Sequence, residues 1–179
     1  MSTRIPYSAL MTDLTDDMFL VLPNSSDSSP AAPTLSFSRS PTVLLTFAGN
    51  RSTRSASRAY SQEFGIGAMD WRMLVMLTRE PGSSVSHAAR TIGIDKAAVS
   101  RSLHRLQDSG LVSGTAEGGD LRRKDWVLTK AGQEMHARIL ARALDRQKAT
   151  LSGFSPSEVA EFTSYLSRFL TNLEALDSD

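Results

Sequence analysis

Residues 95–109 place basic and short polar side chains on one face of an expected helix. The spacing brings together Lys96, Ala97, Ser100, Arg101 and Arg105. An α-helix fits the major groove of DNA, which is about 12 Å wide, and residues near its N-terminal end can approach base edges. We therefore expect the first four residues to read bases, and Arg105, one turn further along, to meet phosphate.

A second basic group follows at the tip of an expected β-hairpin. Leu111-Val112 and Trp126–Leu128 have the apolar character of two strands, and Glu117-Gly118-Gly119-Asp120 can turn between them. The tip carries Arg122, Arg123 and Lys124. These cations would contact phosphates or a minor groove, and so would contribute to the affinity for DNA more than to sequence specificity.

A third cationic group lies in the first long helix that the sequence predicts. Arginines recur there at steps of three and four, and a Trp-Arg pair follows in the next helix: Arg51, Arg54, Arg58, Trp71 and Arg72. Arginine can hold a carboxylate or phosphate, so these residues are candidates for binding an anionic small molecule. The alternative is that the arginines are solvated or pair with Glu63 and Asp70, and that Trp71 is part of the core.

The composition excludes several kinds of site. There is no cysteine, which rules out disulfides, thiolate zinc sites and a cysteine-based peroxide sensor. His87, His104 and His136 fall on three different expected helices without a metal-binding spacing, and no catalytic motif is present. No secretion signal or run of roughly 18 apolar residues occurs, so we expect a cytoplasmic protein without cofactor or membrane partner.

The charges are divided unevenly along the chain. From Ser86 to Lys130, eight Lys or Arg residues stand against five Asp or Glu, whereas from Ser155 to Asp179 a single Arg168 stands against five acids. The first segment suits a polyanion and the second does not.

The basic residues need elements that position them, and the sequence predicts four short segments for this role. Residues 68–80 are predicted to form a helix with Trp71, Leu74, Val75 and Thr78 on its buried face, and residues 85–92 a second helix closed by Gly93. Asp95 can cap the basic helix, which buries Val99, Leu103 and Leu106 and ends at Gly110. Helix, tight turn, basic helix and hairpin together predict a winged helix-turn-helix.

The last helices offer a surface for a second copy of the chain. Thr129 can cap a long helix, and Ser155, Pro156 and Glu158 form a capping box at the start of the final one, with Phe154 and Val159 as a hydrophobic staple. Apolar residues along the final helix alternate steps of three and four: Val159, Phe162, Leu166, Phe169, Leu173 and Leu176. Such a heptad seam predicts a helix-to-helix dimer interface.

The expected organisation has four parts. Residues 1–39 form an N-terminal extension, with a helical spacing at Leu10, Met11, Leu14 and Met18 and a Ser/Pro-rich linker over residues 23–33. Residues 40–64 form a dimerisation helix that begins at Ser40-Pro41, residues 65–128 the winged lobe, and residues 129–179 the C-terminal dimerisation helices. The fold class is mainly α with a small β-hairpin wing (α+β).

Three stretches resemble the MarR (multiple antibiotic resistance regulator) family of transcription factors over roughly residues 41–176: GAMDWRMLVML, AVSRSLHRLQDSGLV and DLRRKDWVLTKAG. The family has an Asp-x-Arg element in its wing, which Asp120 and Arg122 match here before Leu128-Thr129. The resemblance implies that Arg122 reaches DNA while Asp120 orients it. Many relatives have Glu-Arg after Gly-Leu-Val, where this chain has Ser113 and Gly114.

The resemblance also implies a homodimer built from the first and last helices, and an anionic aromatic acid or acyl thioester as effector, bound between these helices and the winged lobe. We expect a repressor that binds a pseudo-palindromic site in double-stranded DNA and is released by that effector. Three alternatives stay open. The basic helix face could simply be solvated, with hairpin charges that keep an exposed edge from aggregating. The chain could be a winged-helix module for protein contacts only, whose basic face meets an acidic partner, or a small enzyme without a recognisable motif.

Overall fold

The computed structural model describes residues 14–23, 32–116 and 124–176. It divides into two units, Met1–Ala68 and Met69–Asp179, which are described separately. The predicted Asp120, Arg122 and Arg123, together with Leu10 and Met11, lie outside the described residues. Among the described helices, none is long and apolar enough to cross a membrane.

The described part of the N-terminal unit contains a small hairpin, and of the predicted helical stretch only Leu14 and Met18 lie among the described residues. A single 3-10 turn, η2 (Asp16–Met18), leads into β1 (Leu20–Val21), which pairs antiparallel with β2 (Thr34–Leu35). The Phe37 ring then meets Phe47 edge-on at 5.1 Å between ring centroids. The extension is therefore attached to the start of the first long helix, which its helical spacing alone did not indicate.

The long helix α1 (Pro41–Phe64) has the ends that the sequence predicts. Pro41 occupies its first position after the extended Ser40, and Gly65 ends it in the left-handed conformation at φ 70°. The Ser40 hydroxyl lies 3.0 Å from the Thr42 hydroxyl and does not cap a backbone amide. The two ends of α1 thus depend on Pro41 and Gly65 rather than on a hydrogen bond from the Ser40 side chain.

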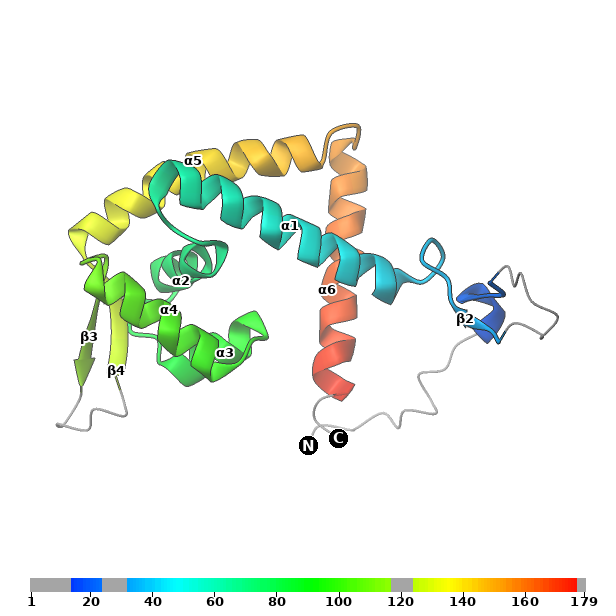
Figure 1. Ribbon diagram of the computed structural model, residues 1–179, viewed down its shortest axis with the longest axis horizontal. Coiled ribbons are helices and arrows are strands. Elements are labelled where there is room, and N and C mark those ends of the chain that lie inside the picture. Colours follow the sequence, from blue (N-terminus) through cyan, green and yellow to red (C-terminus); the bar gives the residue numbers. More distant parts are fainter. Residues whose placement is uncertain (1–13, 24–31, 117–123, 177–179) are drawn as a thin grey trace. The chain divides into compact units, whose positions relative to one another are not determined.

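The second unit contains the predicted helix-turn-helix and wing (Figure 1). Its elements are α2 (Ala68–Arg79), α3 (Val85–Ile92), α4 (Lys96–Asp108), β3 (Val112–Ala116) and β4 (Lys124–Leu128), followed by α5 (Lys130–Thr150) and α6 (Pro156–Leu176). Side chains from several of these elements form the core: Met73, Leu74, Leu77, Val99, Leu103, Leu106, Trp126 and Ile139. This core confirms the predicted buried face of α4.

The prediction for the buried face of α2 was correct for Leu74 and wrong for the other three residues. Leu74 is buried as expected, together with Met73, Met76 and Leu77, whereas Trp71 and Val75 are half-buried and Thr78 is exposed. Apolar residues surround most of this helix, so their periodicity does not select one face. Packing against the rest of the lobe decides which of them become core.

The wing is joined to the helical lobe at two places, at the middle of β4 and at the base of the hairpin. β3 and β4 pair antiparallel with Gly114 opposite Trp126, and an isolated bridge connects Ser83 to Trp126 on the other side. At the base, the Thr129 amide donates to the Leu111 carbonyl at 3.1 Å. A Cβ on Gly132 would stand 2.0 Å from the same carbonyl oxygen, so this backbone crossing requires glycine.

The caps of α5 and α6 confirm the sequence signals. The Thr129 hydroxyl accepts from the Gly132 amide at 3.1 Å, and Ser155 and Glu158 form the reciprocal capping box. Hydrogen bonds from the Ser155 backbone and side chain lower the pKa of the Glu158 carboxyl. The ring of Phe154 lies 6.3 Å from that of Phe162, one turn beyond the residue with which we expected it to form a staple.

Candidate nucleic-acid interface

The tight turn between α3 and α4 is built from two backbone devices. Gly93 ends α3 in the left-handed conformation at φ 72°, and its amide donates to the Ala89 carbonyl. The Asp95 carboxylate accepts from the Ala98 amide at 2.8 Å and so caps α4. Because the end of α3 and the start of α4 both have hydrogen-bond partners, the turn fixes the residue at which α4 starts and the face of α4 that points outward.

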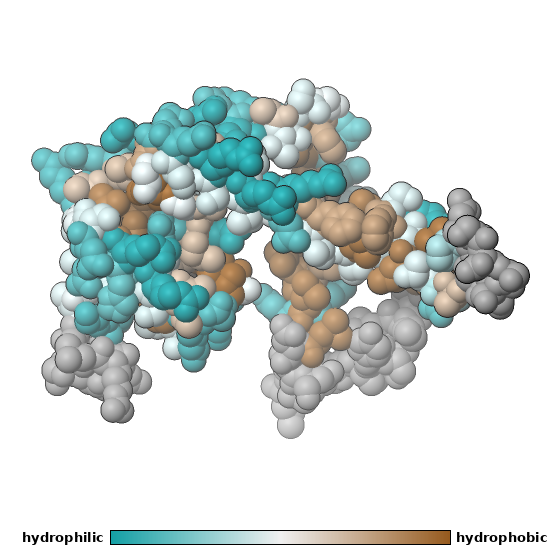
Figure 2. Space-filling model, viewed as in Figure 1, coloured by the Kyte–Doolittle hydropathy of each residue, from teal (hydrophilic) through white to brown (hydrophobic). Residues whose placement is uncertain are grey.

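The outward face of α4 carries the predicted base-reading residues. Lys96, Ala97 and Arg101 are exposed, Ser100 is half-buried, and Val99 on the opposite face is fully buried. Hydrophilic residues cover this part of the lobe in Figure 2. Within the part of the chain that the structure describes, neither Lys96 nor Arg101 forms an ion pair. Their charges are therefore available to a polyanion.

Arg105 is held by a carboxylate from another helix. Its guanidinium donates to Asp70 of α2 at 2.6 Å, and the Ser102 hydroxyl donates to the same carboxylate at 2.5 Å. The Asp70 side chain is only 13% exposed, whereas that of Arg105 is 55% exposed. Asp70 was expected as a possible partner of the α1 arginines, but in this lobe it ties α2 to α4. Arg105 thus has an internal partner as well as an outward surface.

Sequence reasoning missed Asp70 and Ser102 as positioning residues. One signal was present, because Ser102 lies between Val99 and Leu106 on the buried face of α4, where a hydroxyl needs a partner. That partner is 32 residues away in the chain, so only the tertiary structure identifies it.

The described part of the wing presents one of the predicted cations. The Lys124 ammonium lies 5.5 Å from the centre of the Trp126 ring, which is itself buried. A Cβ on Gly114 would lie 3.2 Å from the Lys124 side chain and 3.3 Å from Trp126. The glycine that departs from the family pattern therefore makes room for the indole and the lysine stem.

The predicted effector residues fall in both units. Arg51, Arg54 and Arg58 are exposed on α1, whereas Trp71 and Arg72 are half-buried on α2. Trp71 stacks on His136 with 5.1 Å between ring centroids. That the arginines of α1 and the Trp71-Arg72 pair of α2 form one effector site stays a prediction.

The predicted seam of α6 is not covered within one chain. Phe162, Leu173 and Leu176 are 41–46% exposed, and Val159, Leu166 and Phe169 are half-buried. No residue of α6 is fully buried. A heptad stripe that stays in contact with water is typical of a helix that needs a partner.

The three histidines have separate surroundings. His87 forms a 2.5 Å hydrogen bond with Glu80, His104 meets Trp126 edge-on, and His136 stacks on Trp71. Among the described residues, no three potential metal ligands lie together. Their positions favour packing roles.

Comparison with known proteins gives matches in sequence and in structure. Residues 64–123 match the model of the MarR family. The HTH-type transcriptional regulator PetP of Rhodobacter capsulatus is 28% identical over 100 residues, which cover 56% of this chain and 60% of that protein's length. The match thus spans less than two thirds of this curated relative.

Two solved structures show the similarity of fold. The MarR/EmrR family transcriptional regulator from Acinetobacter sp. ADP1 is 28% identical, with a TM-score of 0.72 over 78% of this chain and 99% of that one. The MepR–DNA complex of S. aureus is 19% identical, with a TM-score of 0.64 over 77% and 99% of the two chains. The chain is thus similar to MarR-family transcriptional regulators in two ways: residues 64–123 match the family model, and the chain shares the winged-helix fold of the regulator from Acinetobacter.

Proposed function

We propose that this protein is a dimeric transcriptional regulator that binds specific sites in double-stranded DNA. The observation that carries the proposal is the outward face of α4. Lys96, Ala97 and Arg101 project from a helix whose other face is buried in the lobe and whose start is fixed by Asp95. A rigid helix with unpaired cations near its N-terminal end suits insertion into a major groove.

Within this proposal, the side chains divide into two roles. Lys96, Ala97, Ser100 and Arg101 would read base edges. Arg105 and the wing cations would contact phosphates, Arg105 from a position that Asp70 holds and Lys124 from its place beside Trp126. The presence of a DNA complex among the proteins of similar fold supports this use of the lobe.

We assign the dimer contact to α6, because its seam is exposed in one chain. Burial of large apolar side chains such as Phe162, Leu173 and Leu176 against a second copy would remove them from water. A two-fold dimer would present two copies of α4 to half-sites about one helical turn apart, which predicts a pseudo-palindromic target. Such a dimer bound at a promoter would act as a repressor.

We further propose that an anionic aromatic acid or acyl thioester releases the protein from DNA. The exposed Arg51, Arg54 and Arg58 supply the charge for a carboxylate or phosphate. A panel of such compounds is titrated against the preferred duplex. The double variant Arg54→Ala, Arg58→Ala should lose the response, whereas Arg79→Ala, which removes an exposed arginine of α2, should keep it.

The experiment that tests DNA recognition is selection of preferred duplexes from a random pool, followed by titration of the winner against salt. We expect a palindromic winner and a steep loss of affinity with ionic strength, because each neutralised phosphate releases counterions. Absence of any enriched sequence would instead favour the protein-interaction module.

A further inference from the structure

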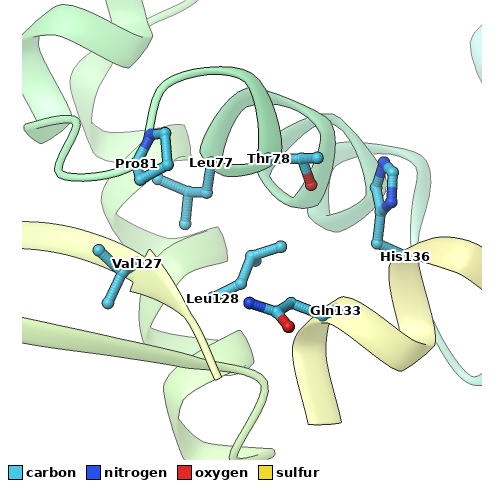
Figure 3. A pocket seen from close by; sticks show the side chains of 7 residues that line it. All are labelled: Leu77, Thr78, Pro81, Val127, Leu128, Gln133 and His136. Atoms are coloured by element: carbon cyan, nitrogen blue, oxygen red, sulfur yellow. The ribbon is translucent and has the colours of Figure 1, made fainter. Parts of the chain in front are cut away.

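The three histidines of the chain lie in different parts of the second unit. His87 on α3 forms a hydrogen bond with Glu80. His136 on α5 lines a cavity of about 310 Å³ between α2, β4 and the start of α5 (Figure 3). His104 is the one of the three that lies on α4, where it is exposed. It therefore shares the helix that carries the proposed base-reading residues.

His104 belongs to the outward face of α4. It follows Ser100 by four residues and Arg101 by three, the spacings at which side chains of an α-helix lie next to each other. Val99 and Leu103 on the other face of the helix are buried. The imidazole therefore extends the row of Ser100 and Arg101 toward the C-terminal end of α4.

His104 also marks the place where α4 meets the wing. Its ring contacts that of Trp126 edge-on, with 5.7 Å between ring centroids and 88° between the planes. The Lys124 ammonium lies 5.5 Å from the centre of the same indole. Among the described residues, the ring nitrogens of His104 have no hydrogen-bond partner. The contact with Trp126 thus positions the imidazole and leaves its nitrogens to a group outside the chain.

The junction of α4 and the wing has a defined counterpart in DNA. In the proposed function, α4 lies in a major groove and the wing lies at the neighbouring minor groove. One sugar-phosphate strand separates these two grooves, so a side chain at the junction faces phosphates rather than base edges. An imidazole can donate a hydrogen bond to a phosphate oxygen, and that bond is stronger when the ring carries a proton.

Charged groups on α4 and on its neighbours influence whether the ring holds that proton. They are Arg101, Arg105 and Asp108 on α4, Lys124 and Asp125 on β4, the Asp70 carboxylate of α2 that bonds to α4, and His87 and Arg90 on α3. β3 adds none, because its sequence is VSGTA. Asp70 pairs with Arg105 and Glu80 with His87, so cations outnumber acids among the rest. A phosphate would add the negative charge that favours a protonated imidazole.

We propose that His104 is a further DNA-contacting residue of α4, which binds a backbone phosphate in its protonated form. The proton comes from the surrounding solution, so each subunit takes up as much as one proton when it binds DNA. The affinity for DNA therefore rises as the pH falls from 8 to 6. Because all duplexes have phosphates, the effect extends to DNA of any sequence. The inference rests on the proposed function.

The first test measures the affinity for a random-sequence duplex at low salt between pH 6 and pH 8 by fluorescence anisotropy. We expect the wild type to bind about tenfold more tightly at pH 6 than at pH 8. His104→Gln keeps a hydrogen-bonding side chain that cannot take up a proton, and should lose most of this difference. His87→Gln is the matched control, because its ring is bonded to Glu80 on another helix, and should behave as the wild type.

A permanent charge separates DNA contact from packing on Trp126. His104→Lys is positively charged throughout this pH range, so its affinity should not vary with pH and should exceed that of the wild type at pH 8 by about fivefold or more. The salt dependence gives a second readout. Between pH 8 and pH 6, the slope of log affinity against log salt should steepen by about 0.9 for each His104–phosphate contact in the wild type, and stay constant in His104→Gln. Equal losses of affinity at every pH in both His104 variants would indicate packing alone and overturn the proposal.

Calorimetric titration at pH 7, in two buffers that differ in ionisation enthalpy, counts the protons taken up on binding. We expect uptake by the wild type and by His87→Gln, and a count near zero for His104→Gln. The same uptake by the wild type and His104→Gln would overturn the role of His104 while DNA binding stands. Failure of the wild type to bind any duplex at low salt and pH 6 would instead overturn the proposed function, and this inference with it.

Discussion

The guanidinium of Arg105 donates a 2.6 Å hydrogen bond to the carboxylate of Asp70, which joins α4 to α2. The same carboxylate accepts from the buried Ser102. One largely buried acid thus sets the position of α4 through two donors that lie one turn apart on the same side of that helix.

Replacement Asp70→Asn keeps the shape of the side chain and removes its charge. We expect a loss of about 1–2 kcal/mol in the free energy of unfolding, because a charge-assisted hydrogen bond is replaced by a neutral one. Urea unfolding measures the change. In an Asp70→Asn, Arg105→Ala double-mutant cycle the effects should be non-additive. Strict additivity would show that the pair contributes nothing to stability.

Replacement Gly132→Ala should be severely destabilising, because the new Cβ would stand 2.0 Å from the Leu111 carbonyl oxygen. We expect a loss of about 3 kcal/mol or more, since backbone must move to relieve the overlap. Gly49→Ala is the matched control, because it also lies within a helix but has no atom within 4 Å of the added Cβ. It should stabilise by roughly 0.5–1 kcal/mol. Similar thermal midpoints for the two variants would contradict the close approach.

Stability should fall as the pH drops below neutrality, and His136 should account for part of that fall. Burial lowers the pKa of its imidazole below 6.5, so the unfolded chain takes up a proton more readily than the folded one. The stabilisation is complete above pH 6.5 and is lost as the pH falls through the folded-state pKa. Urea unfolding between pH 8 and pH 5 should show a shallower decline for His136→Gln. An unchanged slope would assign the pH dependence to other groups.

Arg101→Ala and Arg122→Ala should affect DNA binding in different ways. Loss of a base contact by Arg101 should cost about 1–3 kcal/mol on the selected duplex and much less on random DNA. Loss of a phosphate contact by Arg122 should weaken both to a similar degree and reduce the salt dependence. Fluorescence anisotropy on the two duplexes measures this. Equal losses on every sequence for Arg101→Ala would remove its base-reading role.

The double change Leu166→Asp, Phe169→Asp should convert the proposed dimer to a monomer. Two carboxylates within an apolar seam would lose hydration without gaining partners. Light scattering gives the mass directly, and Glu161→Asp on the same helix is the control that keeps the charge. A doubly substituted protein that is still dimeric would exclude α6 from the interface.

Local signals in the sequence predicted most of the fold. The helix starts predicted from caps at Asp95, Thr129 and Ser155 were correct, because each cap depends on residues only three positions apart. The prediction of the buried face of α4 was also correct, because a helix with a single apolar stripe packs with that stripe toward the core. α2 lacked such a stripe, and its face could not be chosen without the rest of the lobe.

The parts of the candidate site that depend on residues far apart in the chain could not be predicted from the sequence. The outward set on α4 follows from helical periodicity, whereas the Asp70 contact spans 35 residues. The cavity combines α2, β4 and α5, so no single segment carries its pattern. Contacts between elements that are far apart in the chain depend on how those elements pack. A local sequence pattern therefore does not predict them.

The crossing of backbones at Gly132 means that the wing begins and ends at one fixed point. Leu111 accepts from Thr129, and the Thr129 hydroxyl donates to the Gly110 carbonyl at 2.7 Å, so the two ends of the 112–128 segment are fastened to each other. Lengthening or shortening the connection between β3 and β4 leaves this fastening, and the helices on either side of it, where they are. The length of the wing can therefore change in evolution without a change in the part of the lobe that holds α4.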